Sequence, residues 1–124
     1  MKIDELIRIK TALFEYSNKL TVEKGRGYGT IEDALANLKL VEHMDVMPAV
    51  LNDFGKLTDK VFRLGRILKL GEVYVGFEGL IDTVVDLGNF NFYIPAILYE
   101  GSEEFRKKFD KKFPNWRESK VVIT

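Results

Sequence analysis

The sequence contains no cysteine and only one histidine, His43. Without cysteine the chain can form no disulfide, no thiolate metal site and no cysteine nucleophile. Zinc sites draw on several His or Cys ligands, so a single histidine disfavours zinc. A Ser-His-Asp triad would have to use His43, and no pattern around that residue indicates one. We interpret His43 as a capping or surface residue at the end of a helix.

An excess of charge and a long apolar run are also missing. Lysine plus arginine and aspartate plus glutamate each number 19, so the formal net charge is zero. A general nucleic-acid-binding protein usually has a basic excess, so we expect no such binding. No apolar run approaches the length of a membrane span, and the charged start MKIDELIRIK lacks the apolar core of a signal peptide. We therefore expect a cytoplasmic protein with no membrane partner.

What the chain does have is apolar residues at helical spacing. With 124 residues, 46% of them hydrophobic, it can form one domain with a buried core. Period-2 alternation is nearly absent, so the pattern predicts an all-α bundle of four main helices. The predicted helices span residues 3–22, 31–43, 48–70 and about 72–99.

Glycine and proline set the predicted boundaries of these helices. We expect the glycine-rich segment GRGYGT (25–30) to break the first helix and Gly71 to stop the third. Pro95 should kink or end the fourth helix. The segment SEEFRKKFDKKF predicts a short charged helix stopped by Pro114, and the tail NWRESKVVIT could be an edge strand, an arm or a partner contact. We assign residues 1–100 to the bundle, and 101–124 to this helix and a tail packed on the same domain. Within the tail, Trp116 is expected to anchor on the bundle.

Three carboxylates recur in the otherwise apolar stretch FEGLIDTVVDLGNFNFY (77–93). On a helix, these carboxylates and two further polar residues fall within an arc of roughly 80°. The set is Glu78, Asp82, Asp86, Asn89 and Tyr93. No Lys or Arg lies between Gly71 and Gly101, so a cation from elsewhere should compensate the charge. That cation could be a basic side chain or a divalent metal, and an all-oxygen ligand set favours Mg²⁺ or Mn²⁺. The alternative is that the stripe is the solvated face of an amphipathic helix.

Basic residues line one side of the preceding helix. Residues 51–70 place Lys56, Lys60, Arg63 and Arg66 on one side, and the opposite side carries Leu51, Phe54, Leu57, Val61, Leu64 and Leu68. Lysine and arginine recognise phosphate oxygens, although a solvated face with an Asp59–Arg63 pair is the alternative. In GRGYGT, Tyr28 could stack on a base, while a plain helix–helix turn is the alternative.

Taken together, these segments resemble the nucleotide modification associated domain family found in many phages, which is similar to MazG-like all-α nucleoside triphosphate pyrophosphohydrolases. The resemblance covers residues 24–93 and rests on three motifs. They are Tyr28-Gly29, the segment Asp59-Lys60-Val61-Phe62-Arg63, and the segment from Glu78 to Phe90. The last motif matches "ExxxDTxxDLxNY" except that Phe90 replaces tyrosine.

The resemblance implies a helical bundle, often dimeric, that binds a nucleotide through Mg²⁺. Glu78, Asp82 and Asp86 would be the metal-facing, catalytic acids, and Lys60 and Arg63 would meet phosphate. Tyr28, Asn89 and Tyr93 would complete the ligand site. The implied activity is pyrophosphohydrolysis of a (deoxy)nucleoside triphosphate by a homodimer in the cytoplasm, which for a virus-encoded protein is that of the host.

One departure from the MazG pattern leaves alternatives open. No ExxE motif precedes the stripe, and its acids are spaced four residues apart rather than three. Glu32 and Glu42 lie too far apart for one metal, whereas Glu15 and Glu23 of the first helix could contribute. The chain could therefore be a non-catalytic nucleotide-binding protein on the same scaffold. A structural interaction module, whose acidic stripe docks a basic helix, is the third possibility.

Overall fold

The protein is all-helical in the part that the structure, a computed structural model, describes. That part comprises residues 1–28, 35–45, 47–71 and 76–121, without the side chains of 24–28 and 37. The helices are α1 (Ile3–Tyr28), α2 (Ala36–His43), α3 (Ala49–Leu70), α4 (Gly76–Gly101) and α5 (Glu103–Lys112). A short 3₁₀ turn, Trp116–Glu118, follows α5. The predicted all-α fold is confirmed, and no helix in these residues is long and apolar enough to cross a membrane.

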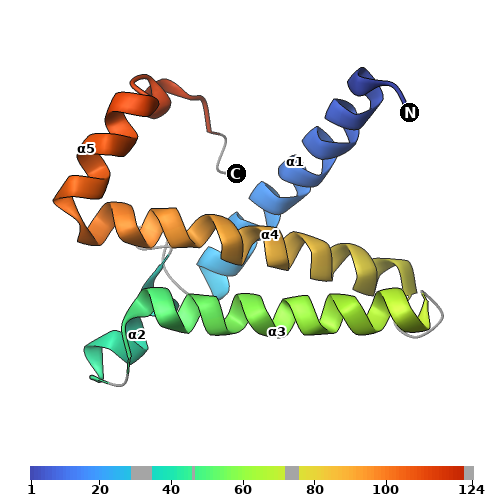
Figure 1. Cartoon of the computed structure of the whole chain (residues 1–124), viewed down its shortest axis with the longest axis horizontal. Helices are drawn as coiled ribbons and strands as arrows, with labels where there is room; N and C mark the ends of the chain where they lie inside the picture. Colours follow the sequence, from blue (N-terminus) through green and yellow to red (C-terminus); the bar gives the residue numbers. More distant parts are fainter. Residues whose placement is uncertain (29–34, 46, 72–75, 122–124) are drawn as a thin grey trace.

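Two long antiparallel helices form the body of the molecule. In Figure 1, α3 and α4 lie side by side, α1 crosses α4, and α5 turns away from the end of α4. The small apolar core contains Leu38, Ala49, Ile67 and Val85, each no more than 6% exposed. Polar residues are buried beside it, namely Asp53, Thr83 and Asn89. Much of the packing between helices therefore involves polar side chains. The candidate site lies among them.

Several predicted boundaries are confirmed. Helix α3 ends at Leu70, and Gly71 follows with a φ of 83°, in the left-handed region that glycine adopts freely. The Gly71 N–H donates to the carbonyl oxygen of Ile67 at 2.7 Å. Helix α5 begins after Ser102, whose hydroxyl oxygen accepts from the Phe105 N–H at 3.1 Å.

One predicted boundary is wrong, because α1 does not break at Gly25 but continues to Tyr28. Helix α4 does not end at Pro95 but passes through it to Gly101, close to the predicted end near Tyr99. A glycine costs a helix only about 1 kcal/mol, which a long helix that is already nucleated can absorb. Proline removes one backbone hydrogen bond, and the contacts of α4 with its neighbours hold the helix across that gap. The predicted start of the fourth helix, and part of the second, lie outside the described residues.

The end of the chain folds back on α4 and α5 through aromatic contacts. The Trp116 ring lies 5.4 Å from Tyr99 and 5.9 Å from Phe109, measured between centroids, in edge-on arrangements. Asp110 accepts hydrogen bonds from the Trp116 indole and the Tyr99 hydroxyl, both at 2.9 Å. The expected Trp116 anchor is confirmed. Of the three forms considered for the tail, the described residues to 121 contain no strand.

Candidate functional site

The acidic stripe of α4 lies where that helix meets α1 and α3. Glu78, in the first turn, is exposed, whereas Asp82 and Asp86 are half-buried and Asn89 is buried. The helix reaches this depth because apolar residues surround the stripe, so most of its circumference packs on neighbours. The stripe is thus not a uniformly solvated face. It descends from solvent at Glu78 into the helix junction at Asn89.

Helix α1 contacts the stripe through two hydroxyl groups. The Tyr16 hydroxyl donates to Asp82 Oδ1 at 2.6 Å, and the Ser17 hydroxyl donates to Asn89 Oδ1. Neither partner was predicted from the sequence. The available signal was that these adjacent polar residues interrupt the apolar pattern of the first helix. Their donors tie α1 to α4 at the point where the two helices cross.

Helix α3 contacts the stripe through its basic side. Lys60 Nζ lies 3.2 Å from Asp86 Oδ2, and both side chains are mostly buried, 30% and 16% exposed respectively. Arg63 Nε donates to the Thr83 hydroxyl at 3.0 Å, and that hydroxyl donates to the Gly79 carbonyl at 2.7 Å. The compensating cation expected from another helix is therefore Lys60 for one of the three acids. Thr83, buried beside the stripe, was also missed by the sequence analysis.

The electrostatic character of the junction is negative. The hydrogen bond to Asp82 and burial raise the pKa of Tyr16 to about 12, with added repulsion from the charges of Asp82, Glu78 and Glu23. A phenol resists ionisation when carboxylates surround it, because its own negative charge would add to theirs. Glu23 of α1 therefore shares the electrostatic environment of the α4 acids. A cation placed there would be attracted by the same groups.

The predicted metal ligands do not converge on one point. Among the described residues, no group of three or more Asp, Glu or His side chains lies close enough together to hold a metal ion. Asp82 and Asp86 face α1 and α3 respectively, through their separate hydrogen-bonding partners. Mg²⁺ can be held by one or two carboxylates together with water and substrate phosphate, so the all-oxygen donor chemistry still fits that ion.

The remaining predicted site residues divide into two cases. Tyr93 is half-buried on α4, where its ring packs edge-on to Phe90 at a centroid distance of 5.9 Å. The side chain of Tyr28 lies outside the described residues, so its predicted stacking on a base stays a prediction. The structure thus pairs Lys60 with Asp86 and Arg63 with Thr83 across the α3–α4 contact, while Tyr93 lies further along α4.

Asp53 of α3 is a buried carboxylate that sequence analysis did not single out as a site residue. It is fully buried, and neither side-chain oxygen has a hydrogen-bond partner. Burial raises its pKa to about 6, and the nearby Lys56 opposes that shift only in part. It lies seven residues before Lys60, on the same side of α3.

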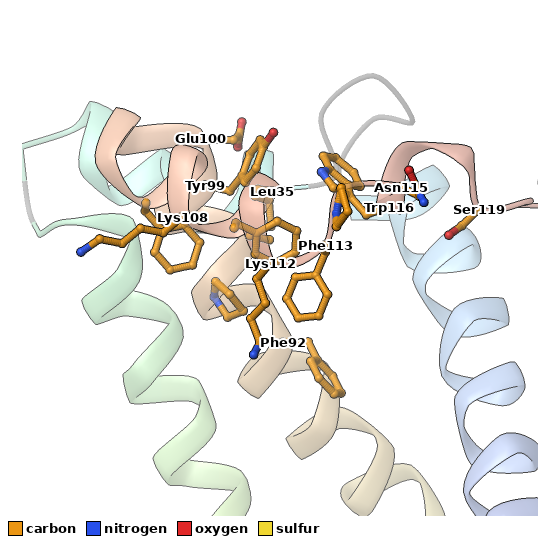
Figure 2. A pocket seen from close by; sticks show the side chains of 15 residues that line it. Leu35, Phe92, Tyr99, Glu100, Lys108, Lys112, Phe113, Asn115, Trp116 and Ser119 are labelled. Atoms are coloured by element: carbon orange, nitrogen blue, oxygen red, sulfur yellow. The ribbon is translucent and has the colours of Figure 1, made fainter.

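A large groove in the described part of the chain lies elsewhere. It has a volume of about 1260 Å³ and runs between the end of α4, α5 and the tail. Figure 2 shows aromatic rings along it, among them Phe92, Phe113 and Trp116, with Lys108 and Lys112 also on its wall. Its lining is apolar and lacks the carboxylate stripe, so it is not the site of the predicted chemistry.

No known protein family, no curated protein and no solved structure matches this chain.

Proposed function

We propose that the protein binds a nucleotide with the help of Mg²⁺ or Mn²⁺ at the α1–α3–α4 junction. The observation that carries the proposal is the meeting of acidic and basic side chains there, with Lys60 placed 3.2 Å from Asp86 across the α3–α4 contact. Carboxylates suit a hard divalent cation, and Lys and Arg suit phosphate oxygens. The resemblance to MazG-like proteins supplies the rest of the proposal: pyrophosphohydrolysis of a (deoxy)nucleoside triphosphate by a cytoplasmic homodimer.

Each side chain has a definite part in this proposal. Glu78, exposed at the start of the stripe, and Asp82, held by Tyr16, are the metal-facing carboxylates. Lys60 exchanges Asp86 for a phosphate oxygen, which frees Asp86 to accept a hydrogen bond from water. Arg63, fixed by Thr83, adds positive charge beside the phosphates. Bound Mg²⁺ supplies charge neutralisation on the phosphate oxygens and acidifies water.

Thermal unfolding in the presence of nucleotides tests the binding. A ligand that binds only the folded state raises the unfolding temperature by mass action. We expect one class of nucleoside mono-, di- or triphosphate to raise it with Mg²⁺ but not with chelator. The Asp82→Asn variant should lose the effect, while Glu103→Gln, which removes an exposed carboxylate on α5, should keep it. A flat response across the whole panel would refute the proposal.

A second function, nucleotide binding without catalysis, is favoured by one observation. Asp86 is already paired with Lys60, and the described carboxylates form no group of three. Release of pyrophosphate from the nucleotide that stabilises the protein separates the two functions. Turnover would support the hydrolase, and stabilisation without turnover would support the binding protein. A purely structural module would show neither metal nor nucleotide dependence.

A further inference from the structure

The outer side of α3 carries an apolar seam that the described chain leaves open. Along this side, residues alternate at intervals of three and four: Leu51, Phe54, Thr58, Val61, Gly65 and Leu68. The large members at the seven-residue interval are Phe54, Val61 and Leu68, which are 56%, 51% and 69% exposed. This spacing is the pattern by which one helix packs along another as in a coiled coil.

The side of α3 that packs inside the chain is a mixed one. Lys60 and Arg63 contact α4, and Ala49, Asp53 and Ile67 are buried. In Figure 1, α3 runs along one side of the molecule, with α4 along its other side and α2 beside its N-terminal end. The apolar seam is left outward, and an amphipathic helix normally buries such a stripe, so the seam calls for a partner.

The chain exposes more area than a compact monomer of its mass. A compact monomer of 14.3 kDa exposes roughly 6,800 Å², whereas this chain exposes 9529 Å². The excess, roughly 2,700 Å² per chain, is as large as the area that an obligate homodimer buries on each partner. Because the formal net charge is zero, net charge repulsion between two copies does not oppose self-association.

We infer that the outer seam of α3 packs antiparallel against the same seam of a second copy. In the antiparallel arrangement the seam is complementary to itself, since Leu51 lies opposite the partner's Leu68 and Thr58 opposite the partner's Val61. Phe54 then lies opposite the partner's Gly65. A Cβ added at Gly65 would meet nothing within 4 Å in the single chain, so a phenyl ring from a partner can occupy that space.

This pairing also explains a glycine in the middle of a long helix. A glycine inside a helix costs about 1 kcal/mol relative to alanine, and nothing within the chain requires one at Gly65. Close approach of a second helix and its Phe54 gives the residue a function. The inference makes specific the homodimer that the proposed function includes, and its test uses no nucleotide, so either can fail without the other.

Light scattering on the eluting protein tests the assembly. We expect a wild-type dimer, a folded monomer for Val61→Glu, and a dimer for Ile7→Glu, which places the same charge on an equally exposed apolar residue of α1. Circular dichroism checks that each variant keeps its helices. A monomeric wild type, or a Val61→Glu variant that stays dimeric, would overturn the inference.

A pair of glycine variants tests the packing directly. Gly65→Leu raises helix propensity and has open space in the single chain, yet it should abolish the dimer by displacing the partner's Phe54. Gly55→Leu is the matched control, because Gly55 is equally unobstructed but lies off the seam. Dimers that persist in Gly65→Leu, or that are lost equally in both variants, would contradict the proposed contact.

The natural absence of cysteine allows the orientation to be read by disulfide formation. Differently tagged Leu51→Cys and Leu68→Cys chains, mixed and oxidised, should form a mixed disulfide if the helices are antiparallel. Leu68→Cys alone should not cross-link to itself. Efficient self-linking of Leu68→Cys would show a parallel pair and overturn the arrangement.

Discussion

Two regions of this protein contain the same hydrogen bond in opposite electrostatic surroundings. At the helix junction the Tyr16 hydroxyl donates to Asp82, and at the C-terminal end the Tyr99 hydroxyl donates to Asp110. The hydrogen bond from Trp116, with further contributions from Tyr99, Arg117 and Arg106, holds the pKa of Asp110 below its usual value against the opposing effect of burial. Tyr16 instead faces an excess of carboxylates, which keep its pKa high.

The comparison separates a carboxylate that completes a structure from carboxylates that can receive a ligand. Around Asp110 every strong interaction is supplied by the chain, namely two hydrogen-bond donors and two nearby cations. Along the stripe, Lys60 is the basic group seen to pair with a carboxylate, and Glu78 is exposed to solvent. Surplus negative charge is what a divalent cation needs, so the proposed site belongs at the junction.

The largest expected effect concerns Asp53, a buried carboxylate whose side-chain oxygens have no hydrogen-bond partner. Because burial raises its folded pKa from 3.8 to about 6, its contribution to stability is present at low pH and is lost as pH rises between these values. The free energy of unfolding should fall by about 3 kcal/mol across that window. Urea titrations at several pH values should show this loss in the wild type and little of it in Asp53→Asn, and an equal loss in both would exclude Asp53 as the cause.

The next largest effect would break the C-terminal region. Trp116→Ala removes an indole that is 37% exposed, together with its hydrogen bond to Asp110 and its contacts with Tyr99 and Phe109. A fully buried tryptophan costs more, so we expect a loss of about 2 kcal/mol. Circular dichroism should be used to monitor unfolding and measure this loss. Trp116 is the sole tryptophan in the sequence, so the variant has no tryptophan fluorescence to report unfolding. Stability equal to that of the wild type would mean that the tail is not held by this ring.

A smaller effect tests the charge balance at the junction. Lys60→Met keeps the aliphatic bulk of the side chain but removes the positive charge that Lys60 places beside Asp86, at a cost of about 1 kcal/mol. Added Mg²⁺ should then stabilise the variant more than the wild type, because the junction has lost one positive charge and attracts the ion more strongly. Lys107→Met, which breaks an exposed pair with Glu103, is the control and should show no gain in Mg²⁺ response. Equal Mg²⁺ responses in both variants would argue against a cation site.

The prediction with the smallest effect at neutral pH concerns the ionisation of Tyr16, which can be followed by spectroscopy. It tests the difference in electrostatic surroundings between Tyr16 and Tyr99. Titration of tyrosinate absorbance should show that Tyr16 still holds its proton above pH 11, with a pKa of about 12. Since this folded pKa is above the usual value of 10.0, the associated stability persists to about pH 10 and is lost above it. Tyr16→Phe should remove that late step, and its persistence in the variant would assign it to another tyrosine.

Much of the local structure was predictable from the sequence. The spacing of apolar residues predicted the helices, Gly71 predicted the end of α3, and Ser102 the start of α5. These are local effects of propensity and capping, which depend on residues close in the chain. The helix break expected at Gly25 was wrong because a long helix that is already nucleated tolerates a glycine, whereas α4 continues through Pro95 to Gly101.

The candidate site was predictable only along α4 and α3. Periodicity placed Glu78, Asp82 and Asp86 on one side of a helix, and Lys60 and Arg63 on one side of another. It could not show that Lys60 reaches Asp86, or that Tyr16 and Ser17 come from α1 to hold Asp82 and Asn89. Those partners are separated by up to 72 residues, a distance over which no local pattern carries information.

By itself the sequence determined the all-α class, the two charged helix faces and the absence of thiol chemistry, because these follow from composition and from a period of 3.6 residues. Only the tertiary structure decided which side of α3 turns inward. Lys60 turns inward because Asp86 on α4 offers it a partner, Ile67 is buried on α3 as well, and Phe54, Val61 and Leu68 are left outward. Both sides have the same helical spacing, so the choice depends on the neighbouring helix and not on the helix alone.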